Sequence, residues 1–230
     1  MKLRLDLGIY LRAIPLLAQH PSILALPILG AVGTLLIDQL ARLTTDPLGG
    51  AGLGLWQYLE QLLVGFCFAG AILGASNVLR KRAGGFDAVW IELRAKTGAV
   101  LLAVMGFLFI TYAAQYIGSM LFAGLGLPLE LATMLFLIYT IPAAIIGGYP
   151  AQLALSASIH AVRKNLLAAI ILAAVFVVTY VWIPPIIFAW LVGVLPIPSA
   201  LYAFGPALIS AIALAYLAFP FAAIYDDVSY

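Results

Sequence analysis

Six long apolar runs dominate the sequence and limit what it can fold into. They cover residues 22–40, 56–78, 98–122, 129–146, 166–191 and 201–224. A helix needs about 20 apolar residues to cross the hydrocarbon core of a bilayer, so each run is long enough to span it. Apolar residues fill 65% of the 230 positions and charged residues only 9%, which leaves too little polar surface for a water-soluble protein. The sequence therefore predicts an all-α, polytopic membrane protein with six transmembrane helices in one domain, residues 1–230.

Basic residues are distributed unevenly between these runs. All of the 11 Lys and Arg residues except Arg42 lie before the first run, after the second or after the fourth. Because basic loops stay on the cytoplasmic side, this bias predicts that both termini are cytoplasmic. The architecture is typical of the bacterial cytoplasmic (inner) membrane, and the net charge of +2 is too small to favour a nucleic-acid partner.

Three shorter segments, at residues 1–21, 84–96 and 150–164, precede the odd-numbered runs. The third is the most regular, because its polar residues recur every three or four positions, as on one face of a helix. These polar residues are Gln152, Ser156, His160, Arg163 and Lys164. We expect a helix at the membrane surface in each segment. Between the first two runs, Thr44–Gly54 contains Asp46-Pro47 and several glycines, which predicts a loop.

The even-numbered runs contain similar small-residue motifs. These motifs are Phe66–Ile72, Ile141–Ile145 and Phe219–Ile224. Their common order indicates three repeats, at residues 1–82, 83–147 and 148–230, each combining a surface helix with a helical hairpin. Small residues also let helices pack closely in lipid, so packing alone is the alternative explanation.

The third surface segment carries a resemblance to a known family. Gly148-Tyr149-Pro150-Ala151, Ala154-Leu155-Ser156 and Val162-Arg163-Lys164-Asn165 lead into an apolar run. This pattern resembles the membrane domain attached to some glycerophosphodiester phosphodiesterases, and related stand-alone bacterial integral membrane proteins. The chain has no room for the soluble phosphodiesterase barrel, so the resemblance implies a membrane domain without that activity.

Glu60 is the acid that stands out inside the apolar runs. An ionisable group within a bilayer is costly and marks function by default. Gln57 lies nearby on the same run, and Asp38 and Arg42 are spaced to pair across one helical turn. Glu60 is therefore a candidate proton or ion site, or part of a polar cluster with Asp38 and Arg42 at the outer surface.

Pro184 and Pro185 interrupt the fifth run. Two adjacent prolines remove two backbone hydrogen bonds and clash with the preceding turn, so we expect this helix to kink or break. Broken helices form binding sites in many transporters, although prolines within spans also serve packing alone.

Two basic groups are candidates for binding lipid headgroups. They are Arg80, Lys81 and Arg82 after the second run, and Arg163 and Lys164 after the fourth. Each basic residue near an anionic membrane surface contributes about 1 kcal/mol to binding. The same residues also act as topology signals.

No catalytic, cofactor or metal site is expected. His20 and His160 lie at segment ends, and Ser156 and Ser158 have no third group to complete a nucleophilic triad. We expect a non-enzymatic protein with a lipid-interacting or membrane-homeostasis role. An accessory subunit that binds other membrane proteins and a small-solute transporter are the alternatives.

Overall fold

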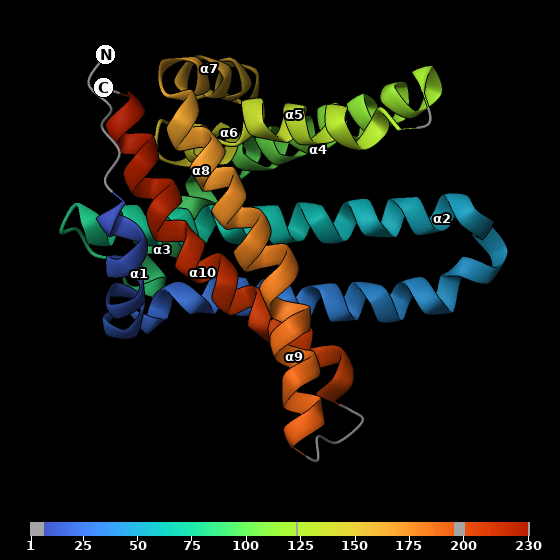
Figure 1. Ribbon diagram of the computed structural model, residues 1–230. Helices are drawn as coiled ribbons and strands as arrows, with labels where there is room; N and C mark the ends of the chain where they lie inside the picture. The colour runs from blue at the N-terminus through green and yellow to red at the C-terminus, as the bar shows by residue number, and fades with distance from the viewer. Residues whose placement is uncertain (1–6, 123, 196–200, 230) are drawn as a thin grey trace.

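Helices make up nearly all of the protein in the computed structural model. The structure describes residues 7–122, 124–195 and 201–229, without the side chains of residues 44–53, 201, 203 and 229. The helices are α1 (Gly8–Gln19), the 3₁₀ helix η1 (Pro21–Leu24), α2 (Ala25–Leu79), α3 (Phe86–Ala95), α4 (Thr97–Leu121), α5 (Gly126–Leu137), α6 (Thr140–Ile145), α7 (Ala151–Lys164), α8 (Leu166–Phe176), the π-helix η2 (Val177–Trp182), α9 (Ile183–Val194) and α10 (Leu201–Ser229) (Figure 1). The described ranges contain no β-strand.

Six segments of the described chain are long and apolar enough to cross a membrane. They are Pro21–Leu43, Gly54–Leu79, Thr97–Leu121, Gly126–Ile145, Leu166–Val194 and Phe204–Val228. Each predicted run agrees with one of them to within about one helical turn at either end. The expected all-α polytopic membrane fold is confirmed.

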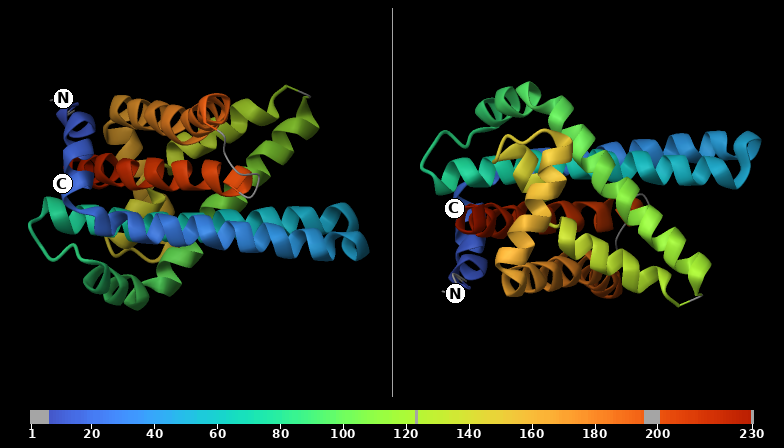
Figure 2. Two further views of the ribbon diagram at one scale, coloured as in Figure 1. Left: turned by 90° about the horizontal axis from the view of Figure 1, so that it is seen from below. Right: turned by 90° about the horizontal axis from the view of Figure 1, so that it is seen from above.

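The spanning helices form hairpins that diverge from a common end (Figures 1 and 2). In the described chain, hairpin 1 is made by the two arms of α2, hairpin 2 by α4 with α5 and α6, and hairpin 3 by α8, η2 and α9 with α10. The helices α1, α3 and α7 and the C-terminal part of α10 lie at the end where the hairpins meet. We call this end the base and the opposite ends of the hairpins the tips. A short helix precedes each hairpin in this arrangement, whereas the sequence repeat itself stays a prediction.

The loop expected at Thr44–Gly54 is helical in backbone, so this prediction was wrong. The structure assigns residues 44–53 to α2, and the ribbon turns back between the two arms of that helix (Figure 1). Glycine and proline permit a helix to bend sharply as well as to end. The composition that indicated a loop is therefore also compatible with a curved helix.

The core of the protein lies at the base. The second arm of α2, α6 and α10 converge there, and the three small-residue motifs of the even-numbered runs contribute to one buried cluster. Ile72, Ile145 and Phe219 are fully buried in it, together with small residues such as Ala143 and Ala222. Since lipid offers helices no hydrophobic drive to associate, such close packing between small residues is what holds the hairpins together.

The fourth span is interrupted between α5 and α6, which the sequence analysis did not anticipate. Pro142 has no N–H, and its ring conflicts with the carbonyl four residues earlier, at Ile138. The buried hydroxyl of Ser158 on α7 donates to the Phe136 carbonyl at 2.9 Å and accepts from the Tyr139 N–H at 3.0 Å. Because the bilayer core holds no water, backbone groups freed by a break must find protein partners. Ser158 supplies them here.

The fifth span is not broken at Pro184 and Pro185. It passes instead through η2 immediately before the two prolines and continues as α9. In an α-helix the proline rings would conflict with the carbonyls of Tyr180 and Val181. The wider π-turn, with bonds between residues five apart, relieves this conflict. The expected departure from α-helical geometry is present, but it is a local widening of the helix into a π-helix and not a break.

Candidate functional site: a cavity between the hairpins

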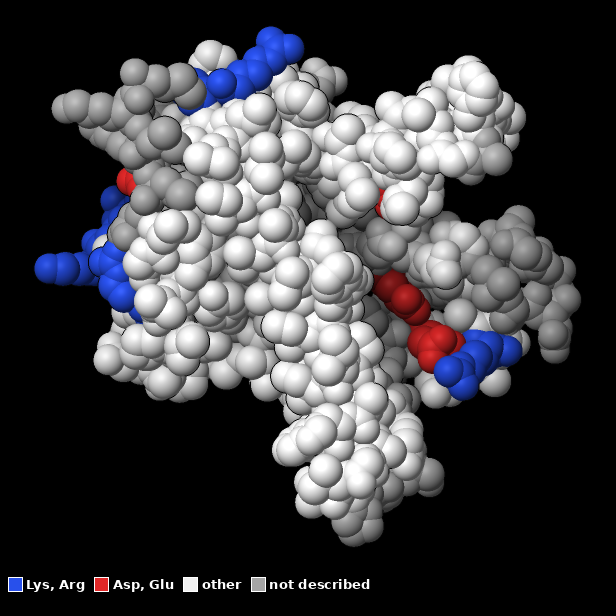
Figure 3. All heavy atoms as spheres, in the orientation of Figure 1, with Lys and Arg blue, Asp and Glu red and all other residues white. Residues whose placement is uncertain are grey.

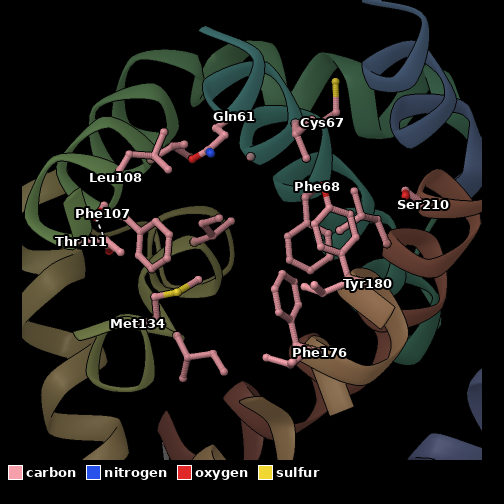
Figure 4. A pocket seen from close by; sticks show the side chains of 18 of the residues that line it. Gln61, Cys67, Phe68, Phe107, Leu108, Thr111, Met134, Phe176, Tyr180 and Ser210 are labelled. Atoms are coloured by element: carbon pink, nitrogen blue, oxygen red, sulfur yellow. Dashed lines mark hydrogen bonds between the residues drawn. The ribbon is translucent and has the colours of Figure 1, made fainter. Parts of the chain in front are cut away.

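A cavity of about 640 Å³ lies between the three hairpins (Figure 4). Its wall is formed by both arms of α2 and by α4, α5, α6, α8, η2 and α10. In Figure 4, Phe107 and Met134 face Phe68 and Phe176 across the opening. Sites for small molecules usually enclose about 300–1,000 Å³, so this cavity has the size of a ligand site.

Aromatic side chains form one side of the cavity. The ring centroids of Phe68 and Phe221 are 5.2 Å apart, and those of Phe176 and Phe221 are 6.0 Å apart, both in edge-to-face arrangements. Phe176 also contacts Tyr180 of η2, with centroids 5.2 Å apart. Phe68 and Phe221 are themselves buried and belong to the core cluster. The aromatic side of the cavity therefore adjoins the packed base.

Polar side chains enter the cavity closer to the tips. Glu130 lies in the first two turns of α5, and Gln115 lies in the last two turns of α4, so both are near the tip of hairpin 2. Tyr112 on α4 lines the cavity together with Gln61 on α2 and lies close to Glu130. Glu60 lines the same cavity from hairpin 1. The cavity thus changes from aromatic near the base to acidic and amide-lined near the tips.

Glu60 is the one predicted intramembrane acid that reaches the cavity. Asp38 and Arg42 form the expected ion pair at 2.9 Å but are absent from the cavity wall. Their side chains are 42% and 68% exposed, and Gln57 is exposed as well. Asp38 is close enough to Glu60 for their charges to interact. The predicted polar group therefore divides into a cavity residue and an exposed pair at the tip.

Sequence reasoning missed Glu130, Tyr112, Gln115 and Ser210, all of which line the cavity. Glu130 carried a usable signal, because it is an acid within the apolar run 129–146 and meets the criterion that selected Glu60. The other three are ordinary polar residues on spanning helices. Only packing distinguishes the ones that face a cavity from those that bond within their own helix.

The proline pair contributes to the cavity indirectly. Pro184 is buried and Pro185 is exposed, and neither lines the cavity. Tyr180 and Val181 do line the cavity, and both belong to the π-helix η2, which lies immediately before the two prolines. The widened turn therefore places side chains in the wall, as π-bulges often do at functional sites.

The basic residues at the base differ in their exposure and in their protein partners. Figure 3 shows Lys and Arg side chains gathered over the base, and a smaller group of mixed charge beside α2. Lys81, Arg82, Arg163 and Lys164 are exposed. Arg80 instead donates twice to the carboxylate of Asp226 on α10, at 2.6 and 3.1 Å. Arg80 therefore joins hairpins 1 and 3, and its guanidinium is already engaged by protein.

A second ion pair fastens α3 at the base. The Lys96 ammonium donates to Glu92 and to the Ile145 carbonyl, both at 2.8 Å. Partial burial alone would raise the pKa of Glu92, but the hydrogen bond and charge of Lys96, aided by Asn77 and Arg82, hold that pKa below its ordinary value. Glu92 is therefore a structural carboxylate.

The cavity is equipped for binding. Its described wall offers two carboxylates, amides and hydroxyls on the side toward the tips. On the side toward the base, Phe68, Phe176 and Phe221 form what we call the aromatic floor. This combination suits a molecule with a polar end and an apolar body. Among the described residues, no group of three or more His, Cys, Asp or Glu side chains is arranged to hold a metal ion. Comparison of the chain with family models, with curated proteins and with solved structures finds no match.

Proposed function

We propose that this chain is a non-enzymatic, lipid-interacting protein of the bacterial inner membrane that holds an apolar or amphipathic molecule in the cavity between its hairpins. The observation that carries the proposal is the cavity of about 640 Å³, lined from all three hairpins within the described chain. A role in membrane homeostasis follows from such binding, because the cavity lies among spanning helices and its ligand would come from the membrane.

The basic residues support an orientation with the base in the cytoplasm. Lys81, Arg82, Arg163 and Lys164 are exposed at the base, where anionic headgroups of the cytoplasmic leaflet would meet them. Arg80 leaves the set of headgroup candidates because Asp226 already binds it.

The resemblance of residues 148–165 to membrane domains of the glycerophosphodiester phosphodiesterase type is a separate argument for a lipid role. The exposed polar face of α7 adds to it, since Gln152, Ser156 and His160 would lie among headgroups while Ala154 and Val162 pack inward.

A small-solute transporter is the second candidate, and Glu60 and Glu130 favour it because acids within spans often bind ions. A transporter site built at the proline pair would be a polar cavity that reaches Pro184. The aromatic floor and the absence of Pro184 from the wall favour the lipid role instead. The accessory-subunit alternative stays open, since exposed apolar side chains on the hairpins suit lipid and partner subunits equally.

Native mass spectrometry of the protein released from nanodiscs tests the proposal. The wild type is expected to retain an apolar or amphipathic molecule in a fixed ratio. Ala173→Trp places a large side chain at the cavity wall and should lower the retained fraction at least about fivefold. Ala174→Trp is the matched control, because Ala174 is exposed and is not a wall residue.

Retention by the wild type and by Ala174→Trp, with loss in Ala173→Trp, would support the proposal. A wild type that carries no molecule, or equal retention in both variants, would overturn it. A fixed ratio of a second polypeptide in place of a small molecule would favour the accessory subunit.

A further inference from the structure

We infer that the cavity selects an amphiphile with a cationic headgroup, with the head against Glu60 and Glu130 and the apolar body against the aromatic floor. The inference rests on the proposed function and names the chemical class of its ligand. Four observations on the described residues lead to it: the charge of the wall, the supply of hydrogen-bond acceptors, the polarity gradient and the origin of the two acids.

The cavity wall carries acidic charge without basic charge. Glu60 and Glu130 line it, and none of the described wall residues is Lys, Arg or His. The basic residue of this region, Arg42, is paired with Asp38 and is not part of the wall. Both acids lie within spanning segments, where a carboxylate is costly unless a cation compensates it. An anionic headgroup would add like charge, whereas a cationic one completes the site.

The polar groups beside the acids suit a ligand headgroup that donates hydrogen bonds. Gln61 and Gln115 offer amide carbonyls, and the wall adds the Tyr112 hydroxyl. Tyr112 lies close to both Gln61 and Glu130. An ammonium head donates and cannot accept hydrogen bonds, so carboxylates and amide oxygens are the partners it needs.

The polarity gradient sets the direction of the ligand. The acids and amides lie toward the tips, while Phe68 and Phe221 close the cavity toward the packed base. An amphiphile therefore enters with its apolar end directed to the base and its head left near the tips. With the base in the cytoplasm, this head belongs to the outer leaflet.

The two acids come from different hairpins. Glu60 is on α2 of hairpin 1, and Glu130 is on α5 of hairpin 2. A cation held between them would join two hairpins whose tips diverge (Figure 1). Neutralising one acid should weaken selection, and neutralising both should abolish it.

Photolabelling with a matched series of amphiphiles tests this inference. Three probes share one alkyl chain with a terminal diazirine and differ only in the head: primary ammonium, hydroxyl or sulfonate. The protein is placed in phosphatidylcholine nanodiscs, irradiated, and digested for mass spectrometry. In the wild type, the ammonium probe is expected to label cavity peptides at least about tenfold more than the sulfonate probe.

The variant Glu60→Gln with Glu130→Gln should lose this preference while the hydroxyl probe labels the cavity as before. Asp87→Asn is the matched control, because Asp87 is an exposed acid on α3, outside the cavity, and the preference should survive there. Equal labelling by all three heads in the wild type, or a preference that survives in the double variant, would overturn the inference and leave the proposed function standing. Failure of every probe to label the cavity would overturn the proposed function as well.

Discussion

The base and the tips of this protein are built from the same kind of helix, yet they pack very differently. At the base, Phe219, Ile72 and Ile145 have no exposed surface. Toward the tips, large apolar side chains such as Met120 and Phe122 are 70% and 74% exposed. The hairpins are held at one end and spread at the other, with the cavity where they part.

This contrast separates stability from binding. A well-packed base holds three hairpins in register, so the tips can leave space open without unfolding the protein. Binding sites commonly carry such a local loss of packing, which the rest of the fold must offset. We therefore expect the same type of substitution to lower the stability of the protein when it is made at the base, and to change ligand binding when it is made at the cavity.

The largest effect is expected from removing a phenyl ring at the base. Phe219→Ala should lower the free energy of unfolding by about 3 kcal/mol, toward the lower end for such truncations, because lipid reduces the hydrophobic part of the loss. Phe107→Ala removes the same atoms from the half-buried cavity wall and should cost less than about 1 kcal/mol. Unfolding by sodium dodecyl sulfate in mixed micelles measures both. Equal losses would contradict the proposed difference between the two regions.

The next effect concerns the interrupted fourth span. Ser158→Ala leaves the Tyr139 N–H and the Phe136 carbonyl without their buried partner and should cost about 2 kcal/mol. Ser156→Ala, on the exposed face of the same helix, should change stability by less than about 0.5 kcal/mol. The same unfolding assay compares them. A neutral Ser158→Ala would mean that the break is held by packing alone.

A smaller effect is expected from the arginine–aspartate pairs. Arg80 and Asp226 form a two-point contact between helices far apart in sequence, whereas Arg42 and Asp38 are neighbours on one exposed helical turn. Double-mutant cycles with Arg→Met and Asp→Asn should give a coupling of up to about 1 kcal/mol for the base pair and about 0.3 kcal/mol for the tip pair. A stronger coupling at the tip would reverse the comparison.

The smallest effect is a pH dependence at the base. The pKa of Glu92 is held below its ordinary value in the folded protein, so its contribution to stability is present above the unfolded pKa and is lost as pH falls through the folded one. Glu92→Gln should therefore lower the melting temperature slightly at pH 7, and the gap to wild type should narrow below the ordinary glutamate pKa of about 4.3. Thermal melts of both proteins across this range measure the gap. A gap that widens on acidification would refute the assignment.

Features that depend on neighbouring residues were predictable from the sequence. The six spans follow from the length of each apolar run, and the Arg42–Asp38 and Lys96–Glu92 pairs follow from their spacing on a helix. The exposed face of α7 follows in the same way from its polar period. These properties need no knowledge of the rest of the fold. They depend on the thickness of the bilayer and the pitch of a helix.

Features that join distant residues needed the tertiary structure. Ser158 became a bridge across a broken helix, Arg80 became the partner of Asp226, and Glu130 joined Glu60 around one cavity. Each depends on which faces of separate hairpins meet, and an apolar helix in lipid shows no strong polar stripe that would reveal its inward face. The sequence by itself determined that the chain crosses the membrane and where it does so. Only packing among the hairpins decided where they close on one another and where they leave a cavity between them.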